Sequence, residues 1–199
     1  MQPPVTGGSP SRPSVALTFD DGPDGRQTRN VLGVLAYEKV SATFFLSGRS
    51  IERNPLIARQ TAEAGHEVAN HGYQHYPMTL VSPMFVWSNI AMGKGIIEQV
   101  TGVRPRWFRP PHGACDDVIV SCAAACGLQT VMWNVMTDDW HPRATVESIA
   151  ERIAAATAGS IVLCHDKGPC ISEALRRSIP VLKAKGLALV TVTGLLEGA

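Results

Sequence analysis

Short apolar runs alternate with longer amphipathic stretches along almost the whole chain. Most of the runs are β-branched or aromatic and too short to form helices, so they predict buried strands. They cover residues 15–19, 42–46, 67–69, 106–108, 130–135, 161–164 and 188–192. The stretches between them predict about six helices.

Local signals mark where the predicted helices begin and end. Asn54 and Ser82 each offer a capping side chain and are followed by a proline, which suits the first position of a helix. Four glycines follow helical stretches, where a left-handed residue can end a helix. They are Gly65, Gly102, Gly127 and Gly186.

The alternation of strands and helices predicts a mostly parallel sheet, because a helix must carry the chain back between parallel strands. Periodicity alone leaves an open doubly wound sheet and a closed barrel as alternatives. In both, functional groups gather at the carboxyl ends of the strands. We expect a Pro-, Gly- and Ser-rich flexible segment over residues 1–13 and one folded domain over residues 14–199.

Composition excludes several classes of protein. The chain has 199 residues, of which 45% are hydrophobic and 18% charged, with a net charge of +1, so neither nucleic acid nor an anionic membrane is an expected partner. Every apolar run is far too short to span a bilayer. The five cysteines lack CxxC spacing, so we expect buried thiols rather than a structural zinc site.

Two adjacent carboxylates, Asp20 and Asp21, follow the first predicted strand and precede Gly22-Pro23. Glycine and proline enforce a turn, which places both carboxylates at the strand end. Consecutive side chains point in different directions, so one carboxylate can bind a metal while the other faces the reacting atom. An ordinary acidic turn is the alternative.

His71 and His75 follow the third predicted strand at a spacing that lets two imidazoles converge on one ion in a single turn. Gly72 between them favours a shaped loop over a long helix. Two histidines and one carboxylate form a recurrent ligand set for catalytic metals with open positions, and Asp21 would supply the carboxylate. The two histidines and Asp21 together predict a metal site more strongly than the histidine pair or the carboxylate does alone.

Three further polar clusters follow strand ends: Arg109 to Gly113, Asp138 to Pro142, and Leu163 to Asp166. An arginine can hold a carboxylate through two hydrogen bonds, and a histidine at a strand end can act as a general acid. A solvated arginine, a core tryptophan at position 140 and a structural histidine at position 165 are the alternatives. Stability requires none of these clusters, so their recurrence at successive strand ends indicates a catalytic site.

In order, the motifs TFDDGP, NHGYQH, RPPHG, DDW and LCH resemble those of the NodB-type polysaccharide deacetylases, carbohydrate esterase family four. The resemblance runs from about residue 15 to residue 192. It implies a distorted (β/α) barrel with seven or eight mostly parallel strands. It also implies a divalent metal, zinc by preference, with cobalt or nickel as alternatives.

The resemblance assigns roles to the clustered residues. It implies that the metal is held by Asp21, His71 and His75. It implies a catalytic group in which Asp20 is the base, Arg109 tethers that base, His165 is the acid, Asp139 tunes the acid, and the backbone N–H of His112 stabilises the oxyanion. Trp140 and Leu163 match the apolar pocket for the acetyl methyl group. Apart from the resemblance, four aromatic residues are candidates for stacking on sugar faces, with buried packing as the alternative for the first: Trp87, Trp107, Trp140 and Tyr73.

Three positions depart from the pattern of similar proteins. Gly72 stands where a serine or threonine hydroxyl usually braces the histidine loop, His112 replaces a common tyrosine, and Met136 replaces a frequent aspartate. No departure removes a predicted metal ligand or catalytic group. They bear instead on which sugar fits the pocket.

We therefore expect a metal-dependent hydrolase that cleaves the linear amide C–N bond of N-acetylglucosamine units in chitin oligomers, peptidoglycan or a related polysaccharide. An acetylxylan esterase, a small-molecule amide or cyclic imide hydrolase, and a glycan-binding pseudoenzyme are the alternatives. We expect a monomer whose partner is a glycan or N-acetylated sugar. The resemblance favours a secreted or cell-envelope location, whereas residues 1–13 lack the pattern of an export signal, which favours the cytoplasm or a signal already removed.

Overall fold

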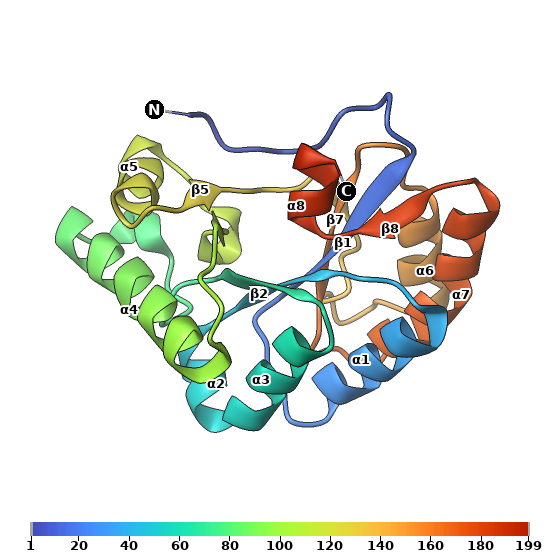
Figure 1. Cartoon of the computed structure of the whole chain (residues 1–199), viewed down its shortest axis with the longest axis horizontal. Coiled ribbons are helices and arrows are strands. Elements are labelled where there is room, and N and C mark those ends of the chain that lie inside the picture. The colour runs from blue at the N-terminus through green and yellow to red at the C-terminus, as the bar shows by residue number, and fades with distance from the viewer. Residues whose placement is uncertain (1, 199) are drawn as a thin grey trace.

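All strand pairings in the sheet are parallel, and the sheet curls so that helices cover its outer side (Figure 1). The computed structural model describes residues 2–198. Within them the strand order is β5-β4-β3-β2-β1-β7-β6, with β8 paired to the first half of β1. The strands are β1 (Ser14–Asp20), β2 (Thr43–Leu46), β3 (Glu67–Asn70), β4 (Trp107–Phe108), β5 (Gln129–Thr130), β6 (Val135–Met136), β7 (Ile161–His165) and β8 (Ala188–Val190).

Helices return the chain between consecutive strands, as the alternating pattern predicts, except between β5 and β6. Seven of them are α1 (Gln27–Glu38), α2 (Gly48–Arg53), α3 (Pro55–Glu63), α4 (Pro83–Thr101), α5 (Asp117–Ala125), α6 (Val146–Ala154) and α7 (Ile171–Ala184). A last helix, α8 (Val192–Glu197), follows β8, and two short 3-10 turns, η1 (Met78–Leu80) and η2 (Pro111–Gly113), lie in loops. The fold is the distorted (β/α) barrel expected from the sequence.

Alternating residues of β1 face two different cores. Val15, Leu17 and Phe19 pack in the layer between the sheet and its helices. Ala16 belongs to a second cluster inside the curl of the sheet, whose other members include Phe45, Ala69, Trp107, Ile161 and Val192. Because side chains alternate along a strand, Thr18 and Asp20 also face this interior. The last residue of β1 is thereby placed at the mouth of the barrel.

The predicted strand over residues 130–135 is wrong as a single element. It is two short strands at opposite edges of the sheet, since β5 pairs with β4 and β6 pairs with β7. Residues 131–134 cross between these edges. The carbonyls of Val131 and Met132 accept hydrogen bonds from the Arg109 side chain, and the Asn134 side chain accepts one from the N–H of Ile161. The N–H of Val131 donates to Phe108 and that of Asn134 to Ile161, so the run bonds to partners on both edges of the sheet and does not continue as one strand ladder.

The segment before β1 is attached to the sheet. The N–H of Val5 donates to Thr130 at 2.9 Å, and the carbonyl of Val5 accepts from Met132 at 2.7 Å. Further on, the N–H of Gly8 donates to Gly159 at 2.8 Å, next to the start of β7. The segment thus crosses one end of the barrel before it enters β1, as Figure 1 shows at the top of the view.

The helix signals were correct to different degrees. Ser82 caps α4 by accepting from the N–H of Phe85, and Gly102 ends that helix with a φ of 73°. Asn54 precedes α3 but forms no side-chain cap, because its amide donates to the carbonyl of Pro23 at 3.0 Å. All five cysteines are free thiols, and no helix within residues 2–198 has the length and apolar character needed to cross a membrane.

Candidate active site

The carboxyl ends of the strands surround a cavity of about 760 Å³. Predicted residues from the ends of β1, β3 and β7, and from the loops after β4 and β6, line it together. They are Asp20, Asp21, His71, His75, His112, Asp139, Trp140, Leu163 and His165. Five segments that are far apart in the sequence therefore supply one site, in agreement with the strand-end argument.

Asp21, His71 and His75 present one ligand atom each within 4.8 Å of one another. The Oδ1 atom of Asp21 lies 3.3 Å from Nε2 of His71 and 2.9 Å from Nε2 of His75. This oxygen is buried and has no hydrogen-bond partner. Burial alone would raise the pKa of the Asp21 carboxyl, but the two imidazoles hold that pKa well below its ordinary value. An ionised carboxylate oxygen that faces two ring nitrogens fits a divalent cation.

The ring of His71 is fixed by its other nitrogen. Nδ1 lies 2.8 Å from the carbonyl oxygen of Arg109, which can accept only if Nδ1 carries the proton. In the neutral ring the lone pair of Nε2 therefore faces Asp21 and the cavity, whereas the protonated ring is the form that lowers the pKa of Asp21. A backbone carbonyl that orients a metal-binding imidazole in this way is a common support for such ligands.

Two asparagines hold the histidine loop in place of the hydroxyl that Gly72 lacks. The side-chain oxygen of Asn70 accepts from the N–H of Gly72 at 2.7 Å, and that of Asn89 accepts from Tyr73 and Gln74. Gly72 has a φ of 76°, a left-handed conformation that glycine adopts without strain. The departure at position 72 therefore leaves the loop braced from β3 and α4.

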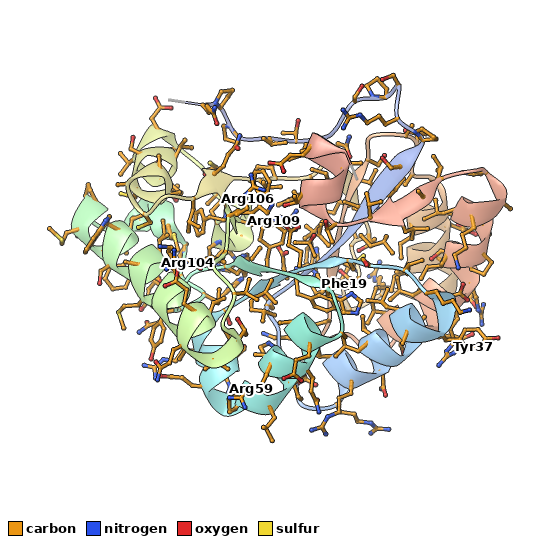
Figure 2. The ribbon with its side chains drawn as sticks, viewed as in Figure 1. Phe19, Tyr37, Arg59, Arg104, Arg106 and Arg109 are labelled. Carbon is orange, nitrogen blue, oxygen red and sulfur yellow. The ribbon has the colours of Figure 1, made fainter. Side chains whose placement is uncertain are left out.

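Asp20 and Arg109 form a buried ion pair beside the three residues Asp21, His71 and His75. Nη1 of Arg109 donates to Oδ1 of Asp20 at 2.7 Å, and to Thr18 at 2.8 Å. Arg109 is fully buried, and its guanidinium lies 4.0 Å from the ring centroid of Phe45. Figure 2 shows Arg109 enclosed by the fold, whereas Tyr37 lies at its outer edge. The second oxygen of Asp20, Oδ2, is 3.9 Å from Nε2 of His71 and faces the cavity.

His165 and Asp139 form a second pair, and His165 stands beside Asp20 in the register of β7 on β1. The Asp139 carboxylate accepts from the backbone N–H of His165 at 2.7 Å and lies 2.8 Å from its ring nitrogen Nδ1. Burial alone would lower the pKa of His165, but Asp139, aided by the charges of Asp20 and Asp21, raises it to about 9. His165 is therefore a cation at neutral pH, with Nε2 left to donate.

His112 lies above the histidine pair in a left-handed conformation, with a φ of 60°. Its ring centroid is 4.3 Å from that of His75, edge to face. Among the described residues no group accepts a hydrogen bond from the backbone N–H of His112. That donor is therefore available to a ligand in the cavity.

One wall of the cavity is apolar. Leu163 is buried on β7, whereas Trp140 is 61% exposed at the rim. Sequence reasoning missed several lining residues, which are Trp133, Lys167, Pro169 and Cys170. Trp133 fell within the single strand predicted for residues 130–135. The signal needed to place the Trp133 side chain at the cavity was a break in the apolar run over residues 130–135.

Three aromatic residues do not line this cavity. The hydroxyl of Tyr73 donates to Glu52 on α2 at 2.6 Å, and the carbonyls of Gly72 and Tyr73 accept from the first N–H groups of α2, so this loop is bonded to α2. The predicted substrate contact of Tyr73 is therefore not supported by its position. Trp107 is buried with its indole N–H on Glu67 and Thr193, and Trp87 lies on the surface of α4.

Comparisons with known proteins agree with this geometry. Residues 7–131 match the family model described as polysaccharide deacetylase. The chain is 39% identical over 189 residues to a peptidoglycan-N-acetylglucosamine deacetylase of Bacillus cereus, an alignment that covers 92% of this chain and 88% of the relative. It is 35% identical to the deacetylase PgdA of Listeria monocytogenes over 89% of this chain, but spans only 38% of that relative.

The fold also matches solved structures. A family four carbohydrate esterase pseudoenzyme from Bacillus anthracis is 32% identical and superposes with a TM-score of 0.94 over 100% of this chain and 70% of that one. A mutant of the same protein, described as having restored enzymatic activity, is 33% identical with the same TM-score, over 100% of this chain and 72% of that one. Family model, relatives and fold coincide, so the chain belongs to the polysaccharide deacetylase family.

Proposed function

We propose that the chain is a metal-dependent hydrolase that removes the N-acetyl group from N-acetylglucosamine units of a glycan, with peptidoglycan as the leading substrate. One observation carries the proposal. Two ion pairs, Asp20–Arg109 and Asp139–His165, lie at the same cavity as the candidate metal ligands Asp21, His71 and His75. In the first the carboxylate faces the cavity, and in the second the cation does, as amide hydrolysis requires.

Asp21, His71 and His75 would hold the cation, which we propose to be zinc, with cobalt or nickel as alternatives. Their mixed nitrogen and oxygen donors and the unpartnered Oδ1 of Asp21 support that assignment. When bound, the cation would polarise the acetyl carbonyl and make water easier to ionise.

Asp20 acts as the general base. Its Oδ1 is held by Arg109, which orients the carboxylate, and its Oδ2 is left to take a proton from the attacking water. As water adds to the acetyl carbon, negative charge develops on the carbonyl oxygen. The backbone N–H of His112 donates a hydrogen bond to that oxygen.

His165 acts as the general acid. An amine leaves readily only when its nitrogen is protonated, and protonated His165 carries that proton on Nε2. Asp139 holds the ring by Nδ1 and keeps it charged. The presence of a charged general acid supports an amide substrate over the ester of an acetylxylan, because an alkoxide leaves with less need for protonation than an amine nitrogen does.

The shape of the cavity supports a glycan. Its volume of about 760 Å³ is within the range of roughly 300–1,000 Å³ that accepts drug-sized ligands, so it can take more than an acetyl group. Leu163 offers an apolar surface for the acetyl methyl, and the exposed ring of Trp140 offers a flat surface for a sugar face. The relatives named above are peptidoglycan deacetylases, which favours that polymer over chitin oligomers.

The pseudoenzyme from Bacillus anthracis makes loss of activity a concrete alternative. It requires a missing or misplaced catalytic group. In this chain Asp20, Asp21, His71, His75 and His165 are all present and all reach the cavity, which supports an active enzyme.

Acetate release tests the proposal. The purified protein, supplied with zinc, cobalt or nickel, is incubated with peptidoglycan, an N-acetylglucosamine pentamer and acetylated xylan, and its metal content is measured in the same sample. We expect acetate from the amide substrates and bound metal in a 1:1 ratio. Asp20→Asn is expected to retain the metal and lose acetate release by about 10²–10⁴-fold. Undiminished release by Asp20→Asn, or no metal and no activity under any condition, contradicts the proposal.

A further inference from the structure

The residue after the proposed acid, Asp166, has no part in the mechanism above although it lies close to it. Asp166 is fully buried directly after β7. Its Oδ1 atom has no hydrogen-bond partner, and its Oδ2 atom accepts from the hydroxyl of Thr28 at 2.5 Å. A carboxyl group in such a place contributes little to stability by itself.

The pKa of Asp166 supports that view. Burial, together with the charges of Asp21 and Asp24, raises the pKa of Asp166 to about 7, against the lowering effect of Thr28 and Lys167. A carboxyl whose folded pKa is raised loses stability as the pH rises through that range. Ionisation of this buried carboxyl near neutral pH therefore costs stability, and a contribution to folding does not by itself account for the side chain.

That reason lies in the contact between Asp166 and the turn after β1. The carboxyl group occupies the space beside Gly22, where an added Cβ would lie 2.7 Å from Oδ1 and closer still to Oδ2. Thr28, which donates to Asp166, accepts in turn from the N–H of Asp24 at 2.7 Å. Asp166 thus contacts the turn at Gly22 and reaches it again two residues later through Thr28.

The other side of the same turn is held by the segment after β2. The carbonyl of Asp21 accepts from Ser50 at 2.9 Å, that of Gly22 from the N–H of Ser47 at 3.0 Å, and that of Pro23 from Asn54 at 3.0 Å. These bonds pull three consecutive carbonyls toward α2 and α3. The carboxyl of Asp166 bears on the turn from the β7 side.

We propose that Asp166 is a positioning residue that presses the Asp21–Pro23 turn against its α2 contacts and so sets where Asp21 lies relative to the cavity. The inference rests on the proposed function, because Asp21 matters as a metal ligand. It also explains Gly22. This glycine is not among the residues with positive φ, so its backbone accepts other side chains, and the Asp166 carboxyl is what excludes them.

The test combines three variants, Asp166→Ala, Asp166→Asn and Gly22→Ala, with the double variant Gly22→Ala/Asp166→Ala. Zinc affinity is measured by competition with a chelator, and kcat and KM by acetate release. We expect Asp166→Ala to weaken zinc binding by about 10–100-fold and to lower kcat more than it raises KM, as loss of an outer support of a ligand does. Asp166→Asn keeps the shape and an acceptor for Thr28, and is expected to restore most of the affinity.

The double variant separates a packed contact from two independent losses. Gly22→Ala should also weaken zinc binding, but removal of the Asp166 carboxyl makes room for the new methyl group. The double variant should therefore bind zinc more tightly than the product of the two single effects. Leu175→Ala, a buried change on α7 away from the turn, is the matched control and should lower the Tm without altering zinc affinity.

Two results overturn the inference while leaving the proposed function intact. One is an Asp166→Ala protein that binds zinc and turns over like the parent, and the other is a double variant whose losses multiply fully. If the parent itself binds no zinc and releases no acetate, the proposed function fails first. That outcome is recognised before any Asp166 variant is made.

Discussion

Replacement of Asp139 by asparagine isolates the charge that keeps His165 protonated. The amide has the shape of the carboxylate, and its oxygen can still accept from the backbone N–H of His165. It cannot offer a negative charge to Nδ1. In the variant, burial still lowers the pKa of His165 and the charges of Asp20 and Asp21 still raise it, so we expect a pKa near the ordinary value of 6.5, against about 9 in the parent.

The size of the effect follows from these two values. A pKa difference of about 2.5 units corresponds to about 3 kcal/mol of preference for the protonated ring. At pH 8 about nine-tenths of His165 is protonated in the parent and about 3% in the variant, so activity should fall by roughly 30-fold. At pH 5.5 both rings are mostly protonated, and the two proteins should differ far less.

The assay is a profile of kcat/KM from pH 5 to pH 10, measured as acetate released from an N-acetylglucosamine pentamer. The alkaline limb should move down by about 2.5 units in Asp139→Asn. A bound cation shifts the alkaline limb of the parent and that of the variant to the same extent, so the difference between the two proteins is the quantity to compare. An NMR titration of the His165 ring in metal-free protein gives the same difference without catalysis. An alkaline limb that stays in place would refute the assignment of His165 as the acid tuned by Asp139.

The same shift affects stability, and its sign can be worked out. The folded pKa of His165 is raised, so the folded state binds this proton more tightly than the unfolded chain does. The contribution is fully present below about pH 6.5 and is lost as the pH rises through about 9. Urea unfolding of the parent should therefore show a loss over that window that Asp139→Asn lacks.

Three other substitutions test separate parts of the site. Arg109→Met leaves the buried Asp20 charge without its partner and should lower the free energy of unfolding by about 3–5 kcal/mol in urea titrations. The double variant Arg109→Met/Asp20→Asn should recover part of this loss. Full stability of the single variant would contradict the pairing. His75→Ala removes a half-exposed ligand and should lower zinc affinity by more than about 100-fold with little change in Tm. Unchanged zinc affinity in this variant would show that His75 is not a metal ligand. Trp140→Ala should raise KM for the pentamer by about 3- to 10-fold with kcat and Tm unchanged, and an unaltered KM would argue against stacking on this ring.

Sequence patterns predicted the site well because it is built where the pattern is strongest. A parallel sheet brings strand ends together, so Asp20, His71, Arg109 and His165 could be placed at one mouth before any distance was known. Their pairing was less accessible. The complete burial of Arg109 and its stacking on Phe45 depend on packing between strands that no local pattern encodes.

The errors share a physical cause. Residues 130–135 look like one strand, but the carbonyls of Val131 and Met132 accept from Arg109, and the run divides between the two edges of the sheet. Asn54 looks like a helix cap, but its amide is used by Pro23. In each case a long-range hydrogen bond overrides the local preference.

The attachment of Val5 beside β5 has a consequence for handling the protein. β5 is an edge strand, and an edge strand with open backbone groups can recruit a strand from another molecule. Val5 satisfies the carbonyl of Thr130 and the N–H of Met132, and so blocks that edge along this stretch. Trimming the first eight residues to aid crystallisation would expose a template for intermolecular β-pairing, and the shortened protein should aggregate more readily on refolding.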